Sequence, residues 1–198
     1  MTEHGVPWIT LDPVWEGGES VIKQGLPRDQ VSPIWQLLLI GDGSPTRHLQ
    51  LLTGEAIKVE VIDMSSIGMD SDNVPHLINE ISGPRLRRQV WLKTDSGQRL
   101  AYATSWWEKN KVDEYLKNKD ASIWESLTSS RIELYRDIRC VQYGNSPVLE
   151  TAFGQPGPFW ARYYMFWHGG QPLTLIHEVF STYLEKYLGK SRLKLDRA

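Results

Sequence analysis

The clearest alternation of apolar and polar positions lies between Leu86 and Trp107, where two β-prone runs flank a short turn. The runs read LRRQVWLK and RLAYATSWW, and Asp-Ser-Gly lies between them. Runs rich in Val, Trp, Tyr and Thr around such a turn predict an antiparallel hairpin. Because side chains alternate between the two faces of a strand, Arg88 shares an apolar face with Val90 and Leu92.

Arg88 on an apolar face raises a question of charge. A guanidinium stays protonated at any ordinary pH, so a buried one needs an anion or several hydrogen-bond acceptors. Two interpretations are open. Arg88 forms a structural ion pair or reaches the rim of the sheet, or it holds an anionic ligand.

Period-two patterning, or a Gly-Gly turn, predicts three further stretches of strand. They cover residues 57–63, 131–142 and 158–180, the second starting at Arg131. Within the second and third stretches, three more charged residues have the parity of apolar neighbours: Arg136, Arg162 and Glu178. Cys140 has the same parity as Arg136.

Helix signals are shorter and fewer. Ser32 followed by Pro33 is typical of a helix start, and this helix is expected to end near Gly41. Apolar residues at helical spacing predict short helices near residues 47–52, 112–116, 123–127 and 183–188. Because strands outnumber helices, we predict an α+β fold, a single antiparallel sheet with short helices packed on one face.

The chain is expected to form one domain with an extension. Residues 1–30 carry several prolines and the Gly17-Gly18 pair without a sustained period, so they are predicted to be an N-terminal extension packed on or trailing from the domain. The domain itself covers residues 31–198, and the polar stretch 63–84 is expected to be a long connection.

Composition narrows the function classes. Twenty-two basic and 24 acidic residues nearly cancel, which argues against a nonspecific nucleic-acid surface. The single cysteine excludes an intrachain disulfide, and no apolar run approaches the roughly 20 residues of a membrane helix. We therefore expect a cytoplasmic protein without a membrane span, acting as a monomer on a small molecule.

The sequence lacks the residue patterns of a metal site, a reactive cysteine or a phosphate-binding loop. The five histidines are scattered and none has Cys/His pairing at ligand spacing, so no metal site is predicted. Cys140 on an apolar face is expected to be an inert core thiol. The glycines of Gly41–Thr46 are followed by no Gly-Lys-Ser/Thr, which favours a turn over a phosphate loop.

What remains is a set of inward-facing charges: Arg88, Arg136, Arg162 and Glu178. If all three arginines are buried with one glutamate, at least one arginine lacks a protein partner, and a dicarboxylate ligand would supply the missing charge. The alternative, that some of these side chains are solvated at the rim, stays open.

Three motifs in order resemble the chorismate lyase family. The stretch WQLLLIGDGSPTRHL…IKVEV, residues 35–61, is similar to the apolar helix, turn and strand that open these proteins. The run RQVWL from Arg88 resembles the family's hairpin, and W-x-R to Arg162, GQPL and EVF from Glu178 resemble its closing hairpin. Tryptophan-rich loops and the WESL…RIELYRDI stretch make the chain most similar to the branch of oxygenic phototrophs.

The resemblance implies a chorismate lyase-like fold and roles for individual residues. Arg88 matches the arginine that binds the substrate carboxylate, and Glu178 matches the catalytic glutamate that faces the ring hydroxyl of the product. Pro45 and Ile123 match positions of main-chain contact to the ligand. Pro45 departs from the pattern because proline has no N–H, and Ala103 departs because some members have an arginine there.

The activity implied by the resemblance is cleavage of chorismate to 4-hydroxybenzoate and pyruvate, without a cofactor, for a quinone pathway such as that of plastoquinone. A glutamate kept protonated by an apolar setting would assist departure of the pyruvyl group. Arg136 or Arg162 is expected nearby to balance the substrate's charge. Two other hypotheses stay open: a non-catalytic small-molecule-binding domain of the same fold, and a chromophore-handling or structural protein.

Overall fold

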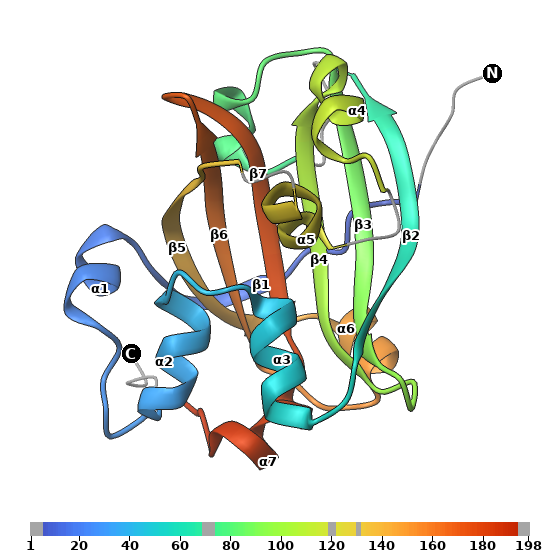
Figure 1. The fold of residues 1–198 in the computed structure, drawn as a ribbon. Coiled ribbons are helices and arrows are strands. Elements are labelled where there is room, and N and C mark those ends of the chain that lie inside the picture. The colour runs from blue at the N-terminus through green and yellow to red at the C-terminus, as the bar shows by residue number, and fades with distance from the viewer. Residues whose placement is uncertain (1–5, 69–73, 119–121, 130–131, 194–198) are drawn as a thin grey trace.

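A computed structural model describes residues 6–68, 74–118, 122–129 and 132–193. Its strands form one antiparallel sheet in the order β1-β5-β6-β7-β4-β3-β2. The strands are β1 (Asp12–Gly17), β2 (Ile57–Ile67), β3 (Arg85–Thr94), β4 (Arg99–Glu108), β5 (Tyr135–Asn145), β6 (Phe159–His168) and β7 (Gln171–Phe180). The predicted single antiparallel sheet is confirmed (Figure 1).

The helices are short. The α-helices are α1 (Glu19–Gln24), α2 (Pro33–Ile40), α3 (Pro45–Thr53), α4 (Val112–Tyr115), α5 (Ile123–Ser129), α6 (Pro147–Phe153) and α7 (Glu185–Leu188). Three 3-10 turns complete the set: η1 (His76–Glu80), η2 (Lys109–Lys111) and η3 (Thr182–Leu184). Among the described residues, no helix is long and apolar enough to span a membrane.

The predicted hairpin is β3 and β4, and its register is set locally. Arg88 lies opposite Ser105, and the turn closes where the Gly97 amide donates to the Thr94 carbonyl at 2.9 Å. Gly97 has a φ of +94°, a conformation that costs glycine nothing and other residues more. The Asp-Ser-Gly signal therefore marked the turn correctly.

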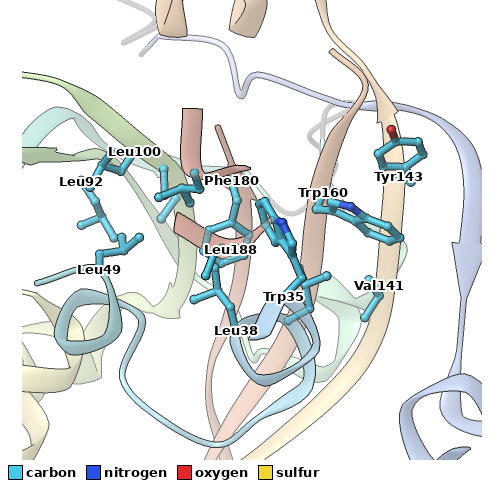
Figure 2. Close-up of a cluster of buried hydrophobic side chains, with 14 of the residues drawn as sticks. Trp35, Leu38, Leu49, Leu92, Leu100, Val141, Tyr143, Trp160, Phe180 and Leu188 are labelled. Carbon is cyan, nitrogen blue, oxygen red and sulfur yellow. The ribbon is translucent and has the colours of Figure 1, made fainter. Parts of the chain in front are cut away.

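One face of the sheet is covered by α2, α3, α5 and α7 (Figure 1). Under α2, α3 and α7, side chains from these helices and from the strands form one apolar cluster (Figure 2). Its labelled members are Trp35, Leu38, Leu49, Leu92, Leu100, Val141, Tyr143, Trp160, Phe180 and Leu188. The Ser32 hydroxyl caps α2 as expected, accepting from the Trp35 amide at 3.3 Å, and so fixes the start of this helix.

The opposite face of the sheet is also covered, by α6, η1 and an N-terminal strap of residues 6–11. A second apolar cluster fills this layer, with Phe153 of α6 and Ile78 of η1 packed on Trp91 and Met165. Four helices thus cover one face of the sheet, and one helix, a 3-10 helix and the strap cover the other.

Four details differ from the sequence predictions. Asp12–Gly17 adds an edge strand beside β5, although no strand was predicted in the N-terminal extension. β2 continues to Ile67 instead of ending at residue 63, because its pairing with β3 resumes after a bulge at Ile62. β5 begins at Tyr135; the predicted start at Arg131 lies outside the described residues.

The fourth difference concerns Cys140. A register shift between Ile138 and Cys140 inserts one extra residue, so Cys140 pairs with Tyr163 and faces the strap side of the sheet, whereas Arg136 faces α2 and α3. A bulge reverses parity downstream of itself, and strict alternation could not detect it. The thiol is buried, as expected, and burial raises its pKa to about 12.

The N-terminal strap is held by both polar and aromatic contacts. The Val6 carbonyl accepts from Arg87 Nη2 at 2.6 Å and from Gln89 Nε2 at 2.7 Å. Trp8 is buried edge-on against Trp106 and His177, with ring centroids at 5.0 and 5.6 Å. The strap is therefore an integral layer over this face.

Trp8→Ala should lower the free energy of unfolding by about 3 kcal/mol, because it removes a buried indole and leaves a cavity. Urea denaturation of the full chain measures this, and Trp8→Phe should recover most of the loss. Val14→Ala, at an exposed position of β1, serves as the control. A loss below about 1 kcal/mol for Trp8→Ala would show that the strap adds little stability.

His177 gives the fold a pH dependence. Its ring is fully buried, neither ring nitrogen has a hydrogen-bond partner among the described residues, and burial lowers its pKa from 6.5 to about 3. Below pH 6.5 His177 binds a proton in the unfolded chain but stays neutral in the native state. This residue should therefore reduce stability by up to about 1.4 kcal/mol per pH unit as the pH falls toward 3.

Denaturation curves between pH 7 and 4 measure this slope. His177→Phe should remove the contribution of His177 to the pH dependence of the free energy of unfolding. Replacement of the exposed His76 by Gln should leave that pH dependence unchanged. An unchanged slope in His177→Phe would contradict the assignment.

Candidate functional site

A small pocket with a cavity volume of about 40 Å³ lies between the sheet and the helices α3 and α5. Its floor comes from β2, β3, β4, β5, β6 and β7, and its cover from the start of α3 and from α5. The polar residues that line it are Thr46, Arg88, Ser105, Ser122, Arg136, Tyr164 and Glu178. The apolar ones are Pro45, Val59, Val90, Leu92, Ala103, Ile123, Trp124, Phe166 and Ile176.

Glu178 is fixed by two donors from the neighbouring strand β6. The register places Arg162 directly opposite Glu178, and Arg162 Nε donates to Glu178 Oε2 at 2.8 Å. The Tyr164 hydroxyl donates to Glu178 Oε1 at 2.8 Å. Burial, together with the nearby Glu178 carboxylate, raises the pKa of Tyr164, so this hydroxyl keeps its proton and remains a donor.

Arg162 has a structural role. It is 0% exposed and does not line the pocket, unlike its partner Glu178. Its Nη1 donates to the carbonyls of Leu38 and Leu39 at 2.7 and 3.2 Å, at the C-terminal end of α2. These carbonyls have no intrahelical partner, and a cation there also complements the helix dipole. Arg162 therefore forms a structural ion pair that anchors α2 to the sheet, and it does not line the pocket where it was expected to balance the substrate's charge.

Within the described part of the chain, Arg136 lines the pocket and has two unsatisfied donors, whereas Arg162, which does not line it, has one. It is 7% exposed, its Nη1 donates to the Gly43 carbonyl, and its Nε and Nη2 have no hydrogen-bond partner among the described residues. The guanidinium carbon lies 4.7 Å from the Tyr164 ring centroid and 5.0 Å from that of Phe166. Burial lowers the pKa of Arg136, which expresses the cost of holding this charge away from water. An anion in the pocket would offset that cost.

Arg88 is 2% exposed and lines the same pocket as Arg136 and Glu178. Alternation along β3 placed it correctly, since Val90 and Leu92 line the pocket too. The solvated-rim interpretation is wrong for all four predicted charges, each of which is buried.

The two predicted main-chain positions also reach the pocket. Pro45 begins α3, where a missing N–H costs no intrahelical bond, and Ile123 begins α5. Glu178 on β7 has a neighbour on each adjacent strand: Ala103 on β4 and Arg162 on β6. The small side chain leaves room beside the carboxylate.

Sequence reasoning missed several parts of the site. Tyr164 has the parity of Arg162, so the signal was present, but a tyrosine in an aromatic strand indicated only core. Ser122 and the Gly43 carbonyl come from connections between elements, where no period exists to place them. The sequence also gave no sign that Gly43 packs against the His48 ring. A Cβ atom added at Gly43 would lie about 2.1 Å from His48 Nε2, so no larger residue fits there unless the ring moves.

Among the described residues around the pocket, buried arginines outnumber buried carboxylates. Three buried arginines face one buried glutamate, and the adjacent His48 has its pKa lowered by burial and by the charges of Arg162 and Arg136. The described residues contain no group of three or more His, Cys, Asp or Glu side chains able to hold a metal ion. The pocket therefore suits a small, planar or apolar molecule that carries carboxylates.

Comparisons with known proteins agree with this chemistry. A family model described as chorismate pyruvate-lyase Rv2949c-like matches residues 39–188. The uncharacterized protein ycf21 of Cyanophora paradoxa is 36% identical over 173 residues, which cover 87% of this chain and 90% of that protein. The chorismate pyruvate-lyase of Mycobacterium leprae is 28% identical over 153 residues, which cover 73% of this chain and 72% of the lyase.

Solved structures support the fold alone. PhnF from Mycobacterium smegmatis superposes with a TM-score of 0.55 at 13% identity, covering 80% of this chain and 71% of PhnF. The possible transcriptional regulator YydK from Bacillus subtilis gives a TM-score of 0.50 at 17% identity, covering 71% of this chain and 62% of YydK. The family model, which matches residues 39–188, shows that the chain belongs to the Rv2949c-like chorismate pyruvate-lyase family.

Proposed function

We propose that this protein cleaves chorismate to 4-hydroxybenzoate and pyruvate, and so supplies an aromatic precursor to quinone synthesis. The observation that carries the proposal is a pocket lined by Arg88, Arg136 and Glu178, in which Arg136 has two unpaired donors. Chorismate is a dianion with a non-aromatic ring, so it matches both the excess of positive charge and the apolar walls.

The two pocket-lining arginines divide the binding task. Arg88 holds the ring carboxylate, as the family resemblance implies, in a bidentate contact that a guanidinium favours. Arg136 holds the carboxylate of the enolpyruvyl group with its Nε and Nη2, the two atoms that lack partners. These contacts fix the ring against Val90, Leu92 and Ile176.

The reaction needs positioning more than a nucleophile. The ring loses a proton, the electron pair of that C–H bond aromatises the ring, and the ether C–O bond breaks. The departing enolpyruvate takes up a proton and becomes pyruvate, so atoms and charge balance without a cofactor. A rigid, dry pocket favours this step by holding the substrate in the reactive conformation.

The role of Glu178 needs revision. The sequence suggested an acid in an apolar setting, but here each carboxylate oxygen accepts a hydrogen bond, from Arg162 and from Tyr164. This arrangement favours Glu178 as an acceptor that orients the ring hydroxyl and stabilises positive charge at the ring. Direct donation of a proton to the leaving group would require these contacts to change.

A second candidate is a non-catalytic binding domain of the same fold, because PhnF and YydK share the architecture. Fold alone does not fix function. Mixing the purified protein with chorismate and following aromatic product and pyruvate separates the two: a lyase forms both in equal amounts, and a binding domain forms neither.

Arg88→Ala should weaken the binding of chorismate and of 4-hydroxybenzoate alike, by on the order of 2–5 kcal/mol, because the carboxylate it holds is present in both. Isothermal titration with 4-hydroxybenzoate measures the loss directly. Lys93→Ala, on the same strand but outside the pocket, should bind normally. Unchanged affinity in a folded Arg88→Ala protein would remove Arg88 from the site.

Glu178→Gln should lower the rate of the chemical step more than it lowers affinity. The amide keeps an acceptor for Arg162 but loses the charge that stabilises the ring as it reacts. Single-turnover rates measured beside 4-hydroxybenzoate binding distinguish the two effects, since slow product release would hide the chemistry in steady state. An unchanged single-turnover rate would leave catalysis to positioning alone.

A further inference from the structure

Helix α2 is apolar almost all round and yet lies on the surface. Its sequence is PIWQLLLI, with no charged residue, and its inner face buries Trp35, Leu38 and Leu39. On its outer face Ile34 is 48% and Leu37 is 65% exposed. A helix that is hydrophobic on all sides is ordinarily covered on all sides.

The neighbouring helix α3 enlarges this apolar surface. Leu51 is 67% exposed, and an apolar groove with a volume of about 220 Å³ runs between α2, α3 and α7. We name this surface the α2–α3 groove; its lining residues are Ile34, Leu37, Leu38, His48, Leu51, Leu52 and Leu188. Contiguous exposed apolar surface of this kind marks a contact site.

The charge around the groove is positive. Exposed Arg47 precedes the groove residue His48, and exposed Lys186 and Lys190 lie on either side of Leu188 in sequence. Arg192 is exposed as well. The only exposed carboxylate of the described segments 33–53 and 185–193 is Asp42, so exposed cations outnumber exposed carboxylates in these two segments.

From these observations we infer that the α2–α3 groove docks on the surface of an anionic lipid bilayer. Leucine and isoleucine side chains on one side of a helix pair, with lysine and arginine beside them, are what interfacial membrane binding requires. A second copy of this chain fits less well, because a two-fold contact through the groove would bring the same cations of both copies together. The inference concerns the outer surface of the helices and does not depend on the proposed lyase activity.

Docking would act on α3, which covers part of the ligand pocket, and on α2, which Arg162 joins to Glu178. Arg162 binds the carbonyls of Leu38 and Leu39 at the end of α2, and Pro45 and Thr46 at the start of α3 line the pocket. Helix α3 therefore contributes to both surfaces, because its start lines the pocket and Leu51 and Leu52 line the groove.

The test is flotation of the full-length protein with vesicles of phosphatidylcholine containing about one third phosphatidylglycerol, compared with phosphatidylcholine alone. The protein should float with the anionic vesicles, and the bound fraction should fall as salt is added. The double variant Leu37→Ser/Leu51→Ser should bind at least about tenfold more weakly. Lys186→Glu/Lys190→Glu should lose a similar factor on anionic vesicles only.

The matched control is Val14→Ser/Val148→Ser, which changes two exposed valines away from the groove. It should bind vesicles as the unaltered protein does, and all variants should show cooperative thermal unfolding. The inference is overturned if the unaltered protein ignores anionic vesicles, or if the control loses as much binding as the leucine pair. It is also overturned if sedimentation velocity shows a dimer that the leucine substitutions dissociate, because a second copy would then cover the groove.

Discussion

The buried ion pair between Arg162 and Glu178 constrains the rest of the structure. Removing two charges from water costs several kcal/mol per ion unless geometry and further hydrogen bonds compensate. Here Arg162 joins Glu178 to the final carbonyls of α2, and Tyr164 satisfies the second carboxylate oxygen. The sheet and α2 are therefore held in one arrangement, and Glu178 is presented to the pocket in a fixed orientation.

Because side chains alternate along a strand, β3 and β7 each contribute residues to the pocket on one face of the sheet and to the strap contacts on the other. On β3, Arg88 faces the pocket, while Arg87 and Gln89 hold the Val6 carbonyl of the strap on the other side. On β7, Glu178 faces the pocket, while His177 lies under Trp8. A shift of one residue in either strand would exchange these sets, so both layers enforce the register.

The donors of Arg136 that have no partner among the described residues are the basis of the proposal that the pocket binds an anion. Arg162 has its carboxylate, whereas Arg136 is packed over Tyr164 and Phe166 with the Gly43 carbonyl as its acceptor. A buried cation in this condition is costly in the free protein, and an anionic ligand relieves that cost on binding. The proposed affinity for a carboxylate thus rests on the cost of burying the Arg136 guanidinium without an anionic partner.

The sequence by itself determined most of the strands and the faces of their side chains, because period-two alternation is a local property of a chain, but it did not predict α1 or α6. It identified Arg88, Arg136, Arg162 and Glu178 as inward charges, and the structure buries all four. It did not reveal the edge strand β1, whose formation depends on pairing with the distant β5, nor the bulge that turns Cys140 to the other face. Only the tertiary structure decided which arginine pairs with Glu178 and which faces the pocket with unsatisfied donors. Those outcomes depend on register and on where the loops place backbone carbonyls such as that of Gly43, and contacts between residues far apart in the chain set both.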